Sequence, residues 1–417
     1  MKKNVKIAVS ELKVGVYVSL PVSWKDHPFL FSKFKITSQT QIELIKSLGV
    51  KEVLYDPQRS DITLTEKEDK EAPAPVDNAS LDNIRQEMLD YKSERIEKQQ
   101  QLKRNIKKTE KQFERSVSMM RSMVSKVSSR PLNAINDARD LISNLTNMLL
   151  DEDNLALHLM SDANASDVIH HHSLNVSMMC MLMAKELNWS REEIELIGIG
   201  CLFHDIGKLK IPSSILNKVV PLSTPEENLV KQHPLMSLNF LKLADTFPEE
   251  AKPMIANHHE FLDGSGTPQG LKAEQLDKFS QLLAVVNEYD NLCNGSLLIK
   301  AKTPSVALGL LYKNYQKKLN LEYVQKLIKL LGIYPPGSVV ELSNGHFGMV
   351  MSVNLKNILY PAIIAYDPIV PVAQAPIVEL EKEGMSIVRS LPAAALPEKI
   401  HKYLSPRDNI SYAFGKG

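Results

Sequence analysis

Histidines and carboxylates gather in the stretch between residues 172 and 290. The chain has only 11 histidines in 417 residues, so their concentration here is informative. In chain order the stretch contains His172, the pair His204-Asp205, His233, the pair His258-His259, and Asp263 in a glycine-rich loop. Imidazole nitrogens together with carboxylate oxygens suit Fe, Mn, Zn or Ni, whereas Mg and Ca prefer oxygen ligands alone. The residue types therefore predict a cluster of metal ligands.

His204 and Asp205 form the strongest pair in this cluster. They follow an apolar run that ends at Phe203. Adjacent residues on a helix point about 100° apart, so the two side chains can serve different metal ions, with Asp205 bridging both ions through its two oxygens. His258 and His259 form a second adjacent pair, to which the same argument applies.

Three consecutive histidines, 170–172, lie ahead of these pairs. Only one of them can share the apolar helix face that is formed by Val176, Met179 and Met183. His172 has the right spacing, so we expect it to point inward. We expect the other two histidines to be surface residues.

The order and spacing of five short motifs resemble the HD-GYP phosphodiesterases, a branch of the HD metal-dependent phosphohydrolases. The motifs are HSLNV (172–176), HDIGK (204–208), KQHP (231–234), HHE (258–260) and DGSGTPQGL (263–271). The resemblance implies two divalent transition-metal ions, Fe or Mn ahead of Zn or Ni, held by His172, His204, Asp205, His233, His258, His259 and Asn287. It also implies catalytic roles for Asp205 and Lys208, and substrate contacts from Lys208, Asp263, Gly264, Gly266 and Thr267.

The sequence departs from the family pattern at several positions. The Gly-Tyr-Pro of the family is Gly266-Thr267-Pro268 here, and the family's last metal-binding carboxylate is replaced by Asn287. Asp290 lies three residues further on the same helix face and could compensate for that loss. The run that supplies a substrate-binding Arg and Lys in the family is replaced at 293–299. Val168 stands where some members carry a glutamate for a third metal, so two metals are expected.

The resemblance implies metal-dependent hydrolysis of a cyclic dinucleotide in bacterial signalling. The leading expectation is cyclic di-GMP, opened to linear pGpG and onward to GMP, and the second is 3',3'-cyclic GMP-AMP. Two cations can lower the pKa of water and stabilise an in-line transition state, while Lys208 would neutralise the scissile phosphate. The alternatives are a degenerate domain that binds a nucleotide or a partner protein without turnover, and a purely structural helical bundle. The departures from the family pattern favour the interpretation as a degenerate domain, whereas the retained ligand residues argue against that interpretation.

The pattern of elements predicts a mainly α chain. It comprises a helical-bundle HD-type catalytic domain, a small α+β N-terminal domain and a short β-rich C-terminal appendage. The predicted units are 1–62 (the N-terminal domain, regulatory by resemblance), 63–80 (a flexible linker), 81–130 (a long helix), 131–333 (the catalytic domain) and 334–417 (the appendage, with a disordered tail from 405).

Local signals place several elements within these units. β-branched runs predict strands at 5–9, 14–18 and 53–55. Ser38 is positioned to cap a helix that Gly49 ends. Runs at 338–342 and 347–353 predict a hairpin, and Asn344-Gly345 between them indicates a type I′ turn. From about 165 to 331 the pattern is almost wholly helical.

The long helix carries a thin apolar stripe amid charged residues. The stripe consists of Leu89, Ile96, Leu102, Ile106, Phe113, Met120 and Val124. One interpretation is a solvated helix that packs on its own domain. The other is a homodimeric coiled coil through residues 81–129, because the stripe and its flanking charges fit a few imperfect heptads.

Bulk composition excludes some classes of partner. Fifty basic residues against 49 acidic residues leave a formal charge of +1, so no basic face for duplex nucleic acid is expected. No apolar stretch approaches the roughly 18 residues that a membrane helix needs. Cys180, Cys201 and Cys293 are isolated, as in a reducing compartment. We therefore expect a cytoplasmic protein. The resemblance implies a cyclic dinucleotide substrate and, as further partners, other signalling proteins.

Overall fold

The computed structural model describes most of the 417 residues. The described residues are 5–23, 26–29, 31–62, 78–152, 155–160, 168–242, 246–295, 300–354, 361–368, 370, 372, 375, 377–378, 380, 385–406 and 410–416. The predicted linker at 63–80 lies almost wholly outside these ranges, since the description resumes at Asn78. Among the described helices, none combines the length and the hydropathy that crossing a lipid bilayer requires.

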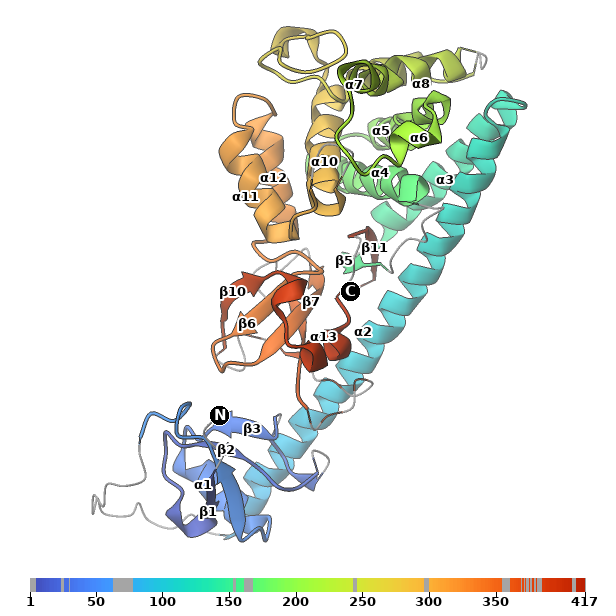
Figure 1. Ribbon diagram of the computed structural model, residues 1–417. Helices are drawn as coiled ribbons and strands as arrows, with labels where there is room; N and C mark the ends of the chain where they lie inside the picture. Colours follow the sequence, from blue (N-terminus) through green and yellow to red (C-terminus); the bar gives the residue numbers. More distant parts are fainter. Residues whose placement is uncertain are drawn as a thin grey trace.

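The N-terminal domain is a four-stranded antiparallel sheet covered by one helix (Figure 1). The strands are β1 (Val5–Ala8), β2 (Tyr17–Ser19), β3 (Lys33–Lys35) and β4 (Glu52–Tyr55), in the spatial order β1-β4-β2-β3. Helix α1 (Gln39–Ser47) begins where the Ser38 hydroxyl accepts the Gln41 N–H. Gly49 follows the helix at φ +71°, a conformation that favours glycine. The predicted strands at 5–9 and 53–55 and the predicted helix are confirmed, whereas β2 begins later than predicted.

Helix α2 (Asn78–Lys126) runs from the N-terminal sheet to the helical bundle (Figure 1). Its apolar stripe faces the chain itself: Phe113 and Met120 are buried in the main core, together with Ala138 and Leu141 of helix α3 (Pro131–Asp151). The interpretation of a helix that packs on its own domain is therefore supported. The homodimer through residues 81–129 stays a prediction.

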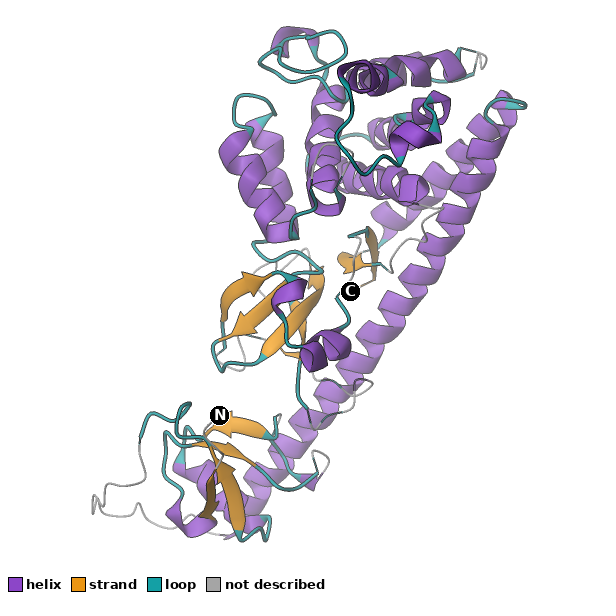
Figure 2. Ribbon diagram, in the orientation of Figure 1, coloured by secondary structure: helices purple, strands orange, loops and turns teal. Residues whose placement is uncertain are grey.

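The catalytic bundle is helical, as predicted (Figure 2). Its helices are α4 (Val168–Glu186), α5 (Arg191–Phe203), α6 (Ser213–Leu216), α7 (Thr224–Lys231), α8 (His233–Leu241), α9 (Lys252–Asn257), α10 (Lys278–Asn294), α11 (Pro304–Asn314) and α12 (Leu321–Leu331). Local capping fixes several starts: Ser190 and Glu193 form a capping box on α5, and Asp277 accepts two N–H groups of α10. The three cysteines are buried free thiols.

Within the described residues, the second sheet has seven strands. They are β5 (Leu155–Leu159), β6 (Val339–Leu342), β7 (Phe347–Asn354), β8 (Ala362–Ala365), β9 (Ile377–Val378), β10 (Ile387–Leu391) and β11 (Tyr412–Lys416), and helix α13 (Glu398–Leu404) lies against β7. The main path is β10-β6-β7-β5-β11, while β8 pairs with β7 and β9 pairs with β8. Strand β5 comes from the segment between α3 and α4, so this sheet is not made from the C-terminal region alone.

The turn between β6 and β7 corrects the predicted turn type. The hairpin itself is confirmed, and Leu342 pairs with His346 across a three-residue loop. A type I′ turn needs positive φ at two central residues. Here Gly345 has φ +76°, but Asn344 is not among the residues with positive φ. A glycine in the left-handed region at the end of a three-residue loop is the other common hairpin solution.

The predicted disorder of the tail from residue 405 is wrong. Strand β11 pairs along its whole length with β5, from Tyr412 opposite Leu159 to Lys416 opposite Leu155. Tyr412, Ala413 and Phe414 are buried in the same core as helices α2, α3 and α4. Sequence periodicity could not reveal this, because the partner strand lies some 250 residues earlier in the chain.

We predict that the last strand stabilises the bundle. Phe414 is 0% exposed, and replacing a buried phenylalanine with alanine costs about 3–5 kcal/mol. Phe414→Ala should therefore shift urea-induced unfolding, followed by circular dichroism, to clearly lower urea. Lys416→Ala, at the exposed end of the same strand, is the control and should stay within about 0.5 kcal/mol of the parent. Equal midpoints for both variants would contradict a stabilising role for β11.

Candidate metal centre

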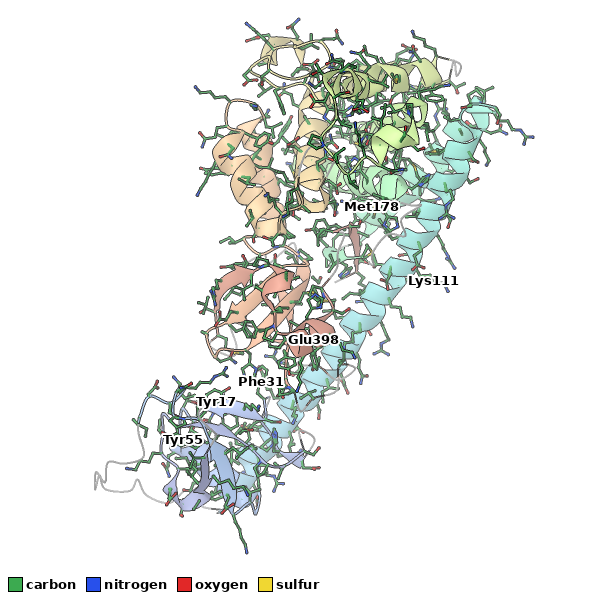
Figure 3. The ribbon with its side chains drawn as sticks, viewed as in Figure 1. Tyr17, Phe31, Tyr55, Lys111, Met178 and Glu398 are labelled. Atoms are coloured by element: carbon green, nitrogen blue, oxygen red, sulfur yellow. The ribbon has the colours of Figure 1, made fainter. Side chains whose placement is uncertain are left out.

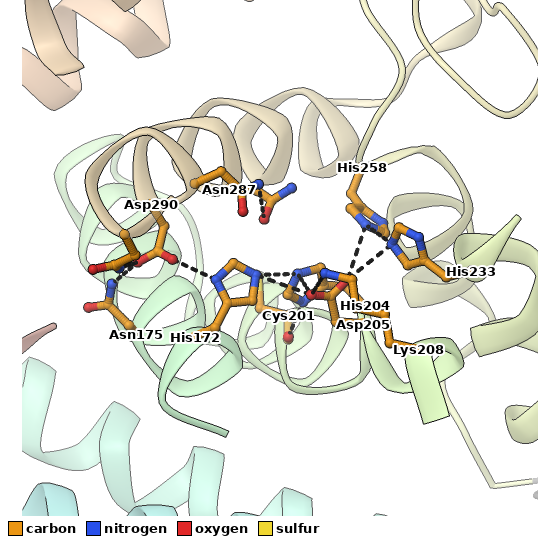
Figure 4. Close-up of polar contacts among 12 residues, drawn as sticks. His172, Asn175, Cys201, His204, Asp205, Lys208, His233, His258, Asn287 and Asp290 are labelled. Atoms are coloured by element: carbon orange, nitrogen blue, oxygen red, sulfur yellow. Dashed lines mark hydrogen bonds and ion pairs between the residues drawn. The ribbon is translucent and has the colours of Figure 1, made fainter. Parts of the chain in front are cut away.

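Helix ends converge on one buried carboxylate (Figure 4). His172 lies in the first half of α4, and His204 directly follows α5. Asp205 precedes the short 3-10 helix Ile206–Lys210. His233 opens α8 and His258 follows α9. Residues from four separate segments, predicted from sequence as ligands, are thus brought together.

The two oxygens of Asp205 face two different groups of histidines. Oδ2 lies 3.2 Å from His172 Nε2 and 3.6 Å from His204 Nε2. Oδ1 lies 3.0 Å from His233 Nε2 and 3.7 Å from His258 Nε2. Potential ligand atoms lie within 4.8 Å of one another in two groups, one of His172, His204 and Asp205 and the other of Asp205, His233, His258 and His259. Asp205 is the residue that the two groups share.

In three of these rings, the hydrogen bond made by Nδ1 determines whether Nε2, the nitrogen that faces Asp205, is free to bind a metal. The Nδ1 atoms of His204, His233 and His258 lie 2.7, 2.6 and 2.8 Å from the backbone carbonyls of Cys201, Val230 and Ile255. A carbonyl can only accept, so each Nδ1 carries a proton, and Nε2 is the nitrogen that faces Asp205 and is left to bind a metal.

Lone pairs then face lone pairs at short range. His233 Nε2 lies 3.1 Å from His258 Nε2, and Asp205 Oδ1 is buried without a hydrogen-bond partner among the described residues. Such atoms repel one another unless a cation lies between them. The donor set of imidazole nitrogens and one carboxylate fits divalent transition metals.

The pKa values agree with this arrangement. Burial lowers the pKa of His204 and His259 well below the usual range and lowers that of His258 to about 4. Burial also lowers the pKa of His172, but the negative charges of Asp290 and Asp205 outweigh it and raise the value to about 9. Burial would raise the pKa of Asp205, yet Lys208 and the neighbouring histidines hold it well below its usual range. A charged carboxylate among mostly neutral imidazoles is the ligand state that metals require.

Lys208 lies at the edge of this cluster. Its Nζ is 2.5 Å from Asp205 Oδ2, and the side chain is partly exposed. Ser237, which sequence reasoning did not single out, accepts the Gly207 N–H at 2.8 Å and donates to the His204 carbonyl at 2.8 Å. A Cβ on Gly207 would approach the His233 carbonyl to 2.1 Å, so only glycine permits this close packing.

Asp290 does not act as predicted. It is buried on α10, but its Oδ2 accepts the Nδ1–H of His172 at 2.6 Å instead of joining either ligand group. It therefore orients the His172 ring through Nδ1, the nitrogen that points away from Asp205, as carboxylates do for metal-binding histidines. Asn287 is buried on α10 near these rings, and its side-chain oxygen accepts from Asn291 at 3.4 Å. Its role as a ligand stays a prediction.

A hydrogen-bonded route connects His172 to the last strand. The Asn175 amide donates to Asp290 Oδ1, and its Oδ1 accepts the Tyr412 N–H at 2.7 Å. Asn294 adds a second link, because it donates to Asp290 at 3.1 Å and pairs with the backbone of Ile410. Asn175 was missed by sequence reasoning, although it belongs to the HSLNV motif.

The glycine-rich loop after His259 is held by Glu260. Its buried carboxylate accepts the N–H groups of Gln269, Gly270 and Leu271 at 2.6, 3.1 and 3.0 Å. Further loop bonds run from the Thr267 N–H to the His259 carbonyl and from the Ser265 N–H to Asp263. These amides are already bonded within the protein, which opposes the idea that they bind phosphate.

The close approach of this loop also needs a glycine. A Cβ on Gly266 would meet Glu260 Cα at 2.4 Å. Substrate contacts from Asp263, Gly264, Gly266 and Thr267 therefore stay predictions, without support from the hydrogen bonds of the described residues. The replaced Arg/Lys run falls partly outside the described residues, at 296–299.

We predict that Asp205 is required for metal retention. Asp205→Ala removes the residue common to both ligand groups, so most bound metal should be lost while the helical circular dichroism signal is kept. Elemental analysis of purified protein measures this directly. Asp263→Ala, which removes an exposed carboxylate of the nearby loop, is the control and should keep full metal content. Full metal occupancy in Asp205→Ala would refute a bridging carboxylate.

Two segments of the chain match known protein families, and several known proteins are similar to it in sequence. Residues 4–138 match a domain of unknown function (DUF3391), and residues 139–320 match the HD domain. A cyclic di-GMP phosphodiesterase of Pseudomonas aeruginosa is 27% identical over 399 residues, which cover 94% of this chain and 92% of that protein. The cyclic di-GMP phosphodiesterase response regulator RpfG of Xanthomonas campestris is 32% identical over 155 residues, 37% of this chain and 41% of that protein.

A third relative is named for a different substrate. The 3'3'-cGAMP-specific phosphodiesterase 1 of Vibrio cholerae is 34% identical over 128 residues, 30% of this chain and 29% of that protein. The chain thus spans nearly the whole first relative but less than half of the other two. Residues 139–320, the segment that carries the histidine cluster, match the HD domain, and the resemblance of the chain to the HD-GYP phosphodiesterases is confirmed.

Proposed function

We propose that this protein is a metal-dependent phosphodiesterase that opens a cyclic dinucleotide, cyclic di-GMP in the first place. The observation that carries the proposal is the buried Asp205 carboxylate shared by two groups of histidines. The relatives named as cyclic di-GMP phosphodiesterases support the same chemistry. The relative named for 3'3'-cGAMP makes the mixed dinucleotide the second candidate substrate.

Two divalent ions are the cofactors that these residues would hold. His172, His204 and Asp205 would bind one ion, and Asp205, His233, His258 and His259 the other. Nitrogen-rich ligands favour Fe, Mn, Zn or Ni over Mg or Ca. When bound, such ions lower the pKa of water and neutralise charge that develops on a phosphoryl group.

The protein's own groups would supply orientation and charge. Asp290 and the backbone carbonyls fix the ring tautomers, so the Nε2 atoms need not rotate on binding. The Lys208 ammonium lies beside Asp205 and is partly exposed. It can therefore meet an incoming phosphate without leaving the cluster, and a lysine suits this role as a point charge.

A domain that binds nucleotide without turnover is the rival function. Asn287 in place of a carboxylate favours it, whereas the assembled histidines oppose it. Product analysis on full-length protein decides between the two. Protein with measured metal content should convert cyclic di-GMP, or 3',3'-cyclic GMP-AMP, into a linear dinucleotide. Metal-loaded protein that leaves both nucleotides intact would refute the phosphodiesterase.

We predict that Lys208 acts on the substrate and is not needed to hold the metals. Removing one preorganised group that stabilises developing charge typically lowers kcat by about 10²–10³-fold. Lys208→Met should therefore lower turnover on this scale while metal content stays unchanged. Lys210→Met is the matched control, because Lys210 is exposed and lies over the Phe240 ring. Parallel loss of metal and activity in Lys208→Met would contradict this role.

Asn287 is the departure that most affects activity. A carboxylate there would add negative charge beside the cations, an attraction that is strong in a buried site. Asn287→Asp should therefore raise both metal content and turnover. Asn291→Asp, one helical turn further on α10, is the control for added charge. If neither quantity rises in Asn287→Asp, then Asn287 does not weaken the site.

A further inference from the structure

A cavity opens between the N-terminal sheet, helix α2 and the turn that joins β6 to β7. Its volume is about 580 Å³, within the range of about 300–1,000 Å³ that is typical of small-molecule sites. Arg59 lines it from the N-terminal domain, Tyr91 and Lys92 from α2, and Asn344 from the turn. The elements that carry these lining residues lie toward the opposite end of α2 from the helical bundle (Figure 1). The cavity is therefore separate from the site described above.

Aromatic rings form much of the cavity wall. Tyr17, Phe29, Phe31 and Phe34 line it from the N-terminal domain, and the rings of Phe29 and Phe34 lie 4.6 Å apart. Figure 3 shows Tyr17 and Phe31 on the side of this domain that faces the C-terminal sheet. Flat apolar rings of this kind suit a ligand that has an aromatic ring of its own.

The charged groups on the wall are all cations. Arg59, Lys35 and Lys92 line the cavity, and no carboxylate side chain occurs among its described lining residues. The Arg59 guanidinium lies 5.3 Å from the Tyr17 ring centroid and donates to the Tyr17 hydroxyl at 3.1 Å.

The two lysines are held by different partners. Lys35 pairs with the exposed Asp61 at 2.8 Å. Lys92 donates to the His27 carbonyl at 2.7 Å, and burial lowers its pKa to about 8. A bound anion would oppose that effect of burial on Lys92, because a negative charge favours the charged ammonium.

We propose that this cavity binds a purine nucleotide as a regulatory ligand. The base would stack among the aromatic rings, and the phosphate would meet Arg59 and the two lysines. This combination of a planar ring and an anionic group is what aromatic and cationic walls recognise together. The inference does not depend on the activity of the metal centre.

The cavity lies where a bound ligand would contact two parts of the chain at once. Where the N-terminal domain meets the C-terminal sheet, the Tyr17 hydroxyl lies 3.2 Å from His346 Nε2, and the Ser32 N–H donates to Asp367 at 3.4 Å. The lining also comes from both parts. A ligand that contacts both the N-terminal domain and the C-terminal sheet stabilises their docked arrangement. It does so because it binds the docked arrangement more tightly than one in which the two parts are separated.

The first test is calorimetric titration of GMP into the full-length protein after metal removal with a chelator. GMP supplies a purine ring and a phosphate, and metal removal excludes binding through the metal centre. We expect saturable one-site binding and a raised melting temperature. Guanosine, which lacks the phosphate, and inorganic phosphate, which lacks the purine ring, should each bind at least tenfold more weakly than GMP. Absence of saturable GMP binding, or equal binding of guanosine or phosphate, would overturn the proposal.

Two variants then locate the site. Arg59→Met removes the cation that lies over Tyr17, and Asn344→Asp adds a negative charge while keeping the side-chain oxygen that accepts the His346 N–H. Each should weaken GMP binding at least tenfold. Arg191→Met is the control, because Arg191 on α5 is 44% exposed, as Arg59 is. GMP binding that persists in both variants would show that the nucleotide binds elsewhere, and the proposal would be wrong.

Discussion

The buried carboxylate of Asp205 is the interaction on which the catalytic domain depends. A buried negative charge is costly unless it is compensated, and here the described compensation is one lysine and the surrounding imidazoles. The helices α4, α5, α8 and α9 bring those groups together at their ends or near them. The rings of His172, His204, His233 and His258 are each fixed through Nδ1, so their Nε2 atoms are presented in one orientation. The arrangement explains why a metal centre can be built from side chains that are distant in sequence.

The orientation of His172 extends this dependence to the end of the chain. Asp290 holds the ring, Asn175 holds Asp290, and the Tyr412 backbone holds Asn175. Strand β11 in turn pairs with β5, which belongs to the second sheet. The sheet and the bundle therefore share a continuous set of buried hydrogen bonds. A C-terminal segment without chemistry of its own thus contributes to the geometry of His172, a proposed metal ligand.

Local signals in the sequence predicted the parts that local physics determines. The Ser38 cap, the long helix α2 and the clustering of the histidines proposed as ligands were all accessible, because caps, periodicity and rare residue types can be recognised within a short window. The pairing of β11 with β5 was not accessible, since strand register over such a separation depends on the assembled core. The role of Asp290 was misjudged for a related reason. Residue type and helix face place a carboxylate near a site, but only the contacts of Nδ1 distinguish a ligand from a residue that holds one.

The balance of charge at the site explains why Asn287 is so important for the proposed activity. Two divalent cations would be bound by neutral imidazoles and by a single carboxylate, with the Lys208 ammonium close by. Such a site carries excess positive charge, which disfavours retention of the second cation and favours an anionic ligand. The phosphate of a substrate would supply the missing negative charge. Metal and substrate would then bind cooperatively, because each neutralises charge that opposes the other.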